Sequence, residues 1–170
     1  MKLSYLFIIL LLSVSLFSSC VSDSRSTEDI ISSLSESGIS LPAGFDYYKT
    51  APISSEGYIS DAELGMLYYD SPEAPLELEA TEDYHILISK APKVFEIHIF
   101  KTIHSSDNDM IERMLTRRSD ILTSPQINPS SSRFMCEVAK ESAVFSNGNF
   151  VFLIAGDEIS DIINAIEKIL

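Results

Sequence analysis

The second half of the chain contains two hairpin signals, and these constrain the fold more than any other feature of the sequence. Residues 84–89 and 94–101 alternate in polarity on either side of a short turn. Residues 143–146 and 149–154 flank an Asn-Gly pair at 147–148, a dipeptide typical of tight hairpin turns. Because such short turns join antiparallel strands, the sequence predicts an antiparallel sheet built from two β-hairpins.

Each hairpin signal is followed by a segment with helical periodicity. Residues 107–122 and 157–169 place apolar side chains at every third or fourth position. The order hairpin, helix, hairpin, helix predicts an α+β fold in which both helices pack on one face of the sheet. The N-terminal portion is expected to consist of helices and loops. Helices are predicted after Ser26 and after Ser60, residues 39–57 are predicted as a loop, and a brief strand is predicted at 76–79.

The predicted register of the first hairpin places two histidines side by side. A four-residue turn puts three apolar pairs opposite one another: Ile88 with Phe95, Ile86 with Ile97, and Tyr84 with Ile99. The other face then holds His85, Glu96 and His98, with both imidazoles in reach of one zinc or copper ion. The alternative is an exposed sheet face that merely tolerates histidines. The outward direction of Glu96 also argues against an ion pair with Arg118 on the following helix.

Both faces of the second hairpin are apolar. Pairing Ser146 with Asn149 puts Phe145, Phe150, Phe152 and Ile154 on one face and Val144, Val151 and Leu153 on the other. If the helices cover only one face, the other is either covered by the N-terminal half of the chain or left open for a partner. Cover by the N-terminal half is preferred, because large exposed apolar patches are uncommon on monomers.

The N-terminus has the features of a bacterial lipoprotein leader. A short positive start precedes apolar residues 3–17, a run below the roughly 17–25 residues of a membrane-spanning helix. Phe17-Ser-Ser-Cys20 resembles a lipobox, in which cleavage precedes a cysteine that carries a diacylglyceryl group. Residues 1–19 are therefore predicted to be a signal peptide and Cys20 the site of lipidation. The alternatives are an ordinary signal peptide cut after Ser19 and an uncleaved anchor.

The remaining chain suffices for one domain. Residues 20–26 are interpreted as the lipidated cysteine with its tether, and residues 27–170 as a single α+β domain. The strand and helix periodicity of this domain is clearest over residues 84–170. With 25 acidic against 12 basic residues and a formal net charge of −13, the chain is expected to bind no nucleic acid and to be held at the membrane by its lipid. Cys136 is expected to be a small buried side chain.

Three short stretches of the second half carry a resemblance to a known family. They are Glu96-Ile-x-Ile-Phe-Lys101, a helix with Arg118 near its end, and Asn147-Gly-Asn-Phe-Val151. Together, over about residues 60–170, they resemble a family of small bacterial lipoproteins known only as domain of unknown function 4358. Phe150 stands where that family more often has tyrosine, and His98 has no expected counterpart. The family has no assigned activity, so the resemblance implies a lipoprotein and assigns no catalytic residue.

These observations favour a non-catalytic binding or accessory module, anchored outside the cytoplasm and serving a process of the cell envelope with a protein partner of unknown identity. No nucleophile elbow, zinc-protease, CxxC, phosphate-loop or dinucleotide motif occurs, and no cofactor is predicted. The alternative is a metal-binding protein or metal-dependent enzyme that uses His85, Glu96 and His98. The tyrosine pairs Tyr47-Tyr48 and Tyr68-Tyr69 could stack on sugar rings, although such pairs more often pack half-buried.

Overall fold

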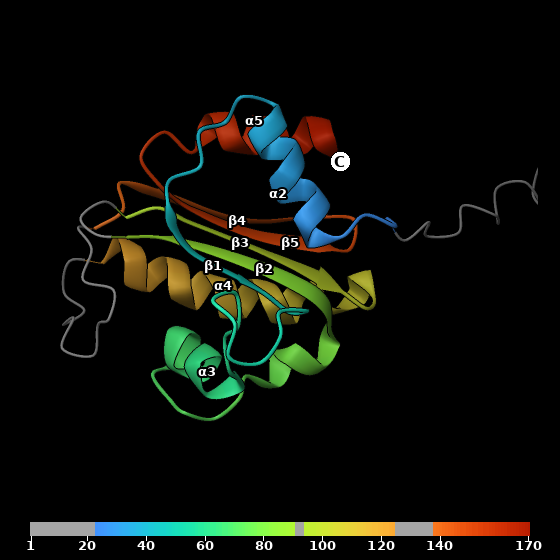
Figure 1. The fold of residues 1–170 in the computed structure, drawn as a ribbon, viewed down its shortest axis with the longest axis vertical. Coiled ribbons are helices and arrows are strands. Elements are labelled where there is room, and N and C mark those ends of the chain that lie inside the picture. Colours follow the sequence, from blue (N-terminus) through green and yellow to red (C-terminus); the bar gives the residue numbers. More distant parts are fainter. Residues whose placement is uncertain (1–22, 91–93, 125–137) are drawn as a thin grey trace, which may run out of the picture.

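The computed structural model describes residues 23–90, 94–124 and 138–170, and it confirms the predicted α+β fold. Within these residues, five antiparallel strands form one sheet in the order β1-β2-β3-β5-β4 (Figure 1). The strands are β1 (Gly44–Tyr48), β2 (Thr81–Ser89), β3 (Glu96–Thr102), β4 (Glu141–Asn147) and β5 (Phe150–Gly156). The helices are α2 (Thr27–Glu36), α3 (Asp61–Tyr69), α4 (Asn108–Thr123) and α5 (Ser160–Ile169), with 3-10 turns η1 (Leu76–Ala80) and η2 (Ser105–Asp107). Among these helices, none combines the length and apolarity needed to cross a bilayer.

Helices cover both faces of the sheet, so the expectation that they share one face is wrong. α3 and α4 lie on one side, and α2 and α5 lie on the other (Figure 1). Neighbouring residues of β2 enter different clusters, with Ile86 on the α4 side and Leu87 on the α5 side. β3 and β5 are buried along their whole length. Because β5 is apolar on both faces, and β3 has Ile97 and Ile99 on one face and Phe100 on the other, a single helical layer would leave apolar side chains in water.

The first hairpin is shifted by one residue from the predicted register. Ile86 lies opposite His98 rather than Ile97, and His85 lies opposite Ile99 rather than His98. A one-residue shift turns every side chain of one strand toward the other face. The predicted register relied on a contrast between a buried and an exposed face, and burial on both faces removes that contrast.

The second hairpin keeps the predicted faces, although its pairing is shifted by two residues. Phe145 lies opposite Phe152 rather than Phe150, and the two-residue loop is Gly148-Asn149. Gly148 takes φ +61°, a conformation that glycine adopts without steric cost at the first central position of a hairpin turn. Both faces of this hairpin are covered, one by α4 and the other by α5, so the open-face alternative is wrong. α2 from the N-terminal half lies in the same layer as α5 but packs on β2 and β3, so the second hairpin is covered by α5 rather than by the N-terminal half.

The N-terminal portion contains both predicted helices and one strand that was not predicted. Ser26 and Ser60 each form a capping box with the acid three residues later, at the starts of α2 and α3. β1 lies within the predicted loop 39–57, and residues 76–79 form η1 instead of a strand. The start of α2 is held to the sheet because the N–H and hydroxyl of Thr27 both donate to Asp83 Oδ2, at 3.0 and 2.7 Å.

The leader 1–19, Cys20 and Cys136 lie outside the described residues, so the predictions made for them stay predictions. Of the predicted tether, residues 23–26 are described. There Arg25 contacts the carboxylate of Asp23 and the main-chain carbonyl of Ile169 at the end of α5. This end of the tether therefore lies against the C-terminal helix of the domain.

Candidate functional site

Four polar side chains from α3, β3 and α4 meet in the layer between the sheet and the helices. The Tyr68 hydroxyl lies 2.6 Å from His98 Nδ1, and His98 Nε2 lies 2.9 Å from Glu96 Oε2. Arg118 donates to both carboxylate oxygens of Glu96, from Nε at 3.0 Å and from Nη2 at 2.6 Å. The ion pair between Glu96 and Arg118 is therefore present. The expectation that Glu96 points away from Arg118 is wrong, because Glu96 faces α4.

The proton positions in this network follow from its electrostatics. Burial alone would raise the pKa of Glu96, but the Arg118 charge and the hydrogen bonds from His98 and Arg118 outweigh burial and lower the pKa to about 2. Burial lowers the pKa of His98, so the imidazole is neutral at pH 7. An ionised Glu96 accepts a hydrogen bond from the N–H at His98 Nε2, which leaves Nδ1 to accept a hydrogen bond from the Tyr68 hydroxyl. Burial raises the pKa of Tyr68 well above its usual value, so this hydroxyl keeps its proton.

The network joins elements of the fold and is closed to solvent. A hydroxyl, an imidazole and a carboxylate in series also occur in nucleophilic catalysis. Here Tyr68 and His98 are 0% exposed and Glu96 is 2% exposed. The four residues line neither of the two cavities described below. Their geometry therefore supports a structural role, in which one satisfied polar cluster ties α3 and α4 to β3.

The structure separates the residues of the predicted metal site. Glu96 and His98 face α4, whereas His85 shares its face with Ile99 on the side of α2 and α5. His85 Nε2 contacts the Asp46 carboxylate on β1, and its buried Nδ1 has no hydrogen-bond partner among the described residues. Within the described ranges, no group of three or more His, Cys, Asp or Glu side chains could hold a metal ion.

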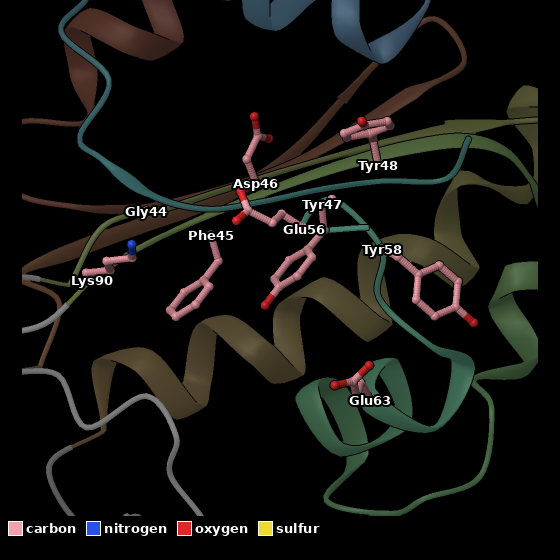
Figure 2. Close-up of a pocket in the computed structure, with 10 residues that line it drawn as sticks. Gly44, Phe45, Asp46, Tyr47, Tyr48, Glu56, Tyr58, Glu63 and Lys90 are labelled. Carbon is pink, nitrogen blue, oxygen red and sulfur yellow. The ribbon is translucent and has the colours of Figure 1, made fainter. Parts of the chain in front are cut away.

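An open groove of about 630 Å³ runs along β1, the edge strand of the sheet (Figure 2). Figure 2 shows the rings of Phe45 and Tyr47 on one side of β1 and the side chains of Asp46 and Tyr48 on the other. The Phe45 and Tyr47 rings are nearly parallel and stacked, with centroids 6.2 Å apart and planes inclined by 2°. Residues from four segments line the groove: Gly44 to Tyr48, Glu56 to Tyr58, Glu63 and Lys90.

The charges of the groove are mostly negative. Asp46, Glu56 and Glu63 contribute three carboxylates, of which Glu63 also accepts from Ser60 in the capping box of α3. The positive charge comes from Lys90, whose Nζ lies 5.5 Å from the centroid of the Phe45 ring, a distance that allows a cation–π interaction. Aromatic rings beside carboxylates form a surface that suits cationic ligands. A second cavity of about 480 Å³ shares Tyr58 with the groove and extends between Lys49 and η1.

The main chain of β1 presents hydrogen-bonding groups to the groove. The N–H of Lys49 donates to Tyr84 O and the N–H of Lys90 donates to Ala43 O, so the odd-numbered residues of β1 bond to β2. Gly44, Asp46 and Tyr48 therefore direct their N–H and C=O groups away from the sheet. The N–H of Tyr48 donates to Gly57 O at 3.1 Å, which closes that end of the edge. At Gly44 and Asp46, the edge has no main-chain partner among the described residues.

The groove was not predicted, because it is assembled from segments that are unremarkable in the sequence. One signal pointed to it: Phe45, Tyr47 and Tyr48 are strand-favouring aromatic residues in the segment that was interpreted as a loop. Tyr47 and Tyr48 line the groove, whereas Tyr68 is fully buried and the hydroxyl of Tyr69 donates to Glu77. Half-buried packing is thus confirmed for Tyr47, Tyr48 and Tyr69, and only the first of the two tyrosine pairs reaches the site.

Comparisons with protein-family models, with curated proteins and with solved structures found no match for this chain. The resemblance to the lipoprotein family of unknown function therefore stays a prediction, and the candidate site rests on the chain's own residues and their geometry.

Proposed function

We propose that this protein is a lipid-anchored, extracytoplasmic binding module that holds a protein partner in the groove along β1 and serves as an accessory to a process of the bacterial cell envelope. The observation that supports it most is the contrast between the two polar assemblies of the molecule. The His98 network is satisfied internally and closed, whereas the groove combines aromatic rings, carboxylates and main-chain groups in a surface open to solvent.

Two features of the chain support the anchored location. The lipobox-like stretch at Phe17–Cys20 is followed by a short polar segment, and α2 begins at Thr27 directly after this segment. The acidic balance of the chain disfavours binding to anionic lipid through a charged surface, so a covalent lipid is the anchor that its chemistry allows. The resemblance of residues 60–170 to small bacterial lipoproteins agrees with this location.

The anchor is tested by mass spectrometry of the processed N-terminus in the membrane fraction. We expect Cys20 as the first residue, with a diacylglyceryl group on its sulfur. An unmodified thiol at Cys20, or a leader still attached to the mature chain, would contradict the proposal.

The binding role is tested by a photoreactive aromatic residue placed in intact cells at Phe45, which is 36% exposed in the groove. The matched control is the same residue at Ile103, a 49% exposed apolar position outside the groove. We expect one defined adduct from position 45 that does not form from position 103, and we expect the purified adduct partner to bind the full chain in detergent. Equal adducts from both positions, or none from position 45, would refute binding through the groove.

A further inference from the structure

We propose that the occupant of the groove is an extended peptide segment of the partner, carrying a basic side chain, that adds to β1 as a sixth strand of the sheet. This inference rests on the proposed binding role of the groove and specifies the chemistry of its ligand. β1 ends the sheet, and its residues Gly44 and Asp46 present their N–H and C=O groups at the spacing of alternate strand residues. An extended main chain is the ligand that matches both donors and both acceptors at once.

The ends of the groove fix where such a strand can lie. At the Tyr48 end, the Gly57 carbonyl already accepts the Tyr48 N–H, so the added strand stops at this point. At the Gly44 end, no described residue closes the main chain in this way, and Lys90 borders the groove. β1 has no proline within it and pairs with β2 without a bulge, so two features that commonly protect a sheet edge against a further strand are absent.

Charge complementarity selects a basic segment. Side chains of an added strand alternate between the two faces, so every second one passes over the aromatic side of the groove near Phe45 and Tyr47. Glu56 is exposed beside the Tyr48 end and is available to pair with a lysine or arginine of the peptide. The formal net charge of −13 favours encounter with a positively charged segment over an acidic one.

The test uses the full chain in detergent micelles as bait for a phage library of short random peptides. We expect enriched peptides to alternate apolar and basic residues. Asp46→Pro removes the outward N–H of position 46 without touching the ladder to β2, because a proline is tolerated where the N–H of an edge strand faces away from the sheet. The matched control is Asp46→Ala, which keeps that N–H and also lacks the carboxylate that contacts His85.

For the enriched peptides we expect Asp46→Pro to weaken binding about tenfold or more, the fold-change that corresponds to one lost hydrogen bond. We expect a smaller loss for Asp46→Ala, about threefold, because this variant removes one groove carboxylate but keeps the N–H of position 46. Glu56→Gln should weaken basic peptides and leave variants of those peptides without lysine or arginine unaffected. Equal losses in the Pro and Ala variants, or enrichment of acidic peptides, would overturn strand addition.

A second measurement tests strand addition without the Asp46→Pro variant, in case that variant does not fold. N-methyl groups are placed on alternate amides of an enriched peptide, once in each of the two registers. Strand addition predicts that one methylated peptide binds and the other does not, because only alternate amides face β1. Equal affinities of the two peptides would overturn strand addition while leaving the groove as a binding site.

Other occupants give distinct results. A second copy of the chain paired edge to edge would appear in sedimentation as a dimer that Asp46→Pro dissociates, and a carbohydrate would bind with an affinity that Asp46→Pro leaves unchanged. Either result overturns the peptide proposal. If no peptide is enriched and position 45 also gives no adduct in cells, the proposed function itself fails.

Discussion

Replacing Arg118 by methionine should cost about 3–5 kcal/mol of the free energy of unfolding. Arg118 supplies two hydrogen bonds to an ionised carboxylate, and bonds of this kind contribute about 1.5–3 kcal/mol each. Methionine fills much of the space but leaves Glu96, 2% exposed, with the single hydrogen bond from His98 Nε2. The loss is expected to be large because a buried carboxylate without its counter-charge must either stay ionised at high cost or take up a proton.

The dependence of this loss on pH separates it from simple loss of packing. In the unchanged chain the Arg118 charge and the hydrogen bonds from His98 and Arg118 hold the pKa of Glu96 at about 2, whereas in Arg118→Met we expect burial to raise that pKa above its ordinary value. A raised folded-state pKa means that the variant is relatively more stable below the unfolded-state pKa of Glu96 and loses that stability as pH rises through the folded-state value. The difference between the two proteins should therefore shrink as pH falls from about 7 to 5.

Urea denaturation of the full chain, followed by far-UV circular dichroism at several pH values, measures this difference. The matched control is the double variant Glu96→Gln with Arg118→Met, in which the neutral amide still accepts from His98 Nε2. We expect the double variant to be more stable than Arg118→Met alone. A loss below about 1 kcal/mol, or a loss that does not change with pH, would refute the reasoning that a buried charge is left uncompensated.

Three further predictions concern neighbouring residues. Tyr68→Phe should lower the free energy of unfolding by about 1–3 kcal/mol in urea denaturation, because buried His98 Nδ1 loses its donor; no loss would contradict that hydrogen bond. Burial lowers the pKa of His98, so as pH falls below about 6.5 the unfolded chain binds a proton that the folded chain does not, and the free energy of unfolding should decrease by up to about 1.4 kcal/mol per pH unit. His98→Gln should remove that contribution, and an unchanged slope would count against it. In a solvent-exposed helix, replacing glycine by alanine stabilises by about 0.5–1 kcal/mol. Gly65→Ala should instead destabilise the protein by about 1–3 kcal/mol, because the added Cβ would lie 2.1 Å from the Glu73 carbonyl oxygen. A gain in thermal stability would contradict this expectation.

Most of the individual helices and hairpins could be predicted because their signals lie within short stretches of sequence. The two hairpins, the helix after each, and the helices that begin after Ser26 and Ser60 all follow from periodicity, turn residues and caps. The placement of the helices on two faces could not be predicted in the same way. It depends on which apolar surface each helix meets, and β5 offers an apolar surface on both sides.

The candidate site was harder to predict than the fold because it exists only at the edge of the assembled sheet. Phe45, Glu56 and Lys90 are separated in sequence, and none of them belongs to a motif with a known chemistry. Conversely, His85 and His98 formed a plausible pair in sequence but lie on opposite faces. Residue types and spacing therefore suggested a metal site, whereas the strand register depends on contacts with α3 and α4 that the local pattern of the hairpin does not show.

That register has a physical cause in the polar network. With apolar residues on both faces of β2, β3 and β5, hydrophobic burial alone distinguishes poorly between this register and one shifted by a residue. Glu96 and His98 remove this ambiguity, because Arg118 and Tyr68 satisfy them only on the side of α3 and α4. A one-residue slip of β3 would turn both toward α2 and α5, where they would lie among aliphatic residues such as Leu87 and Ile162 and would lose these partners. The buried charges thus contribute to the choice of one register between β2 and β3.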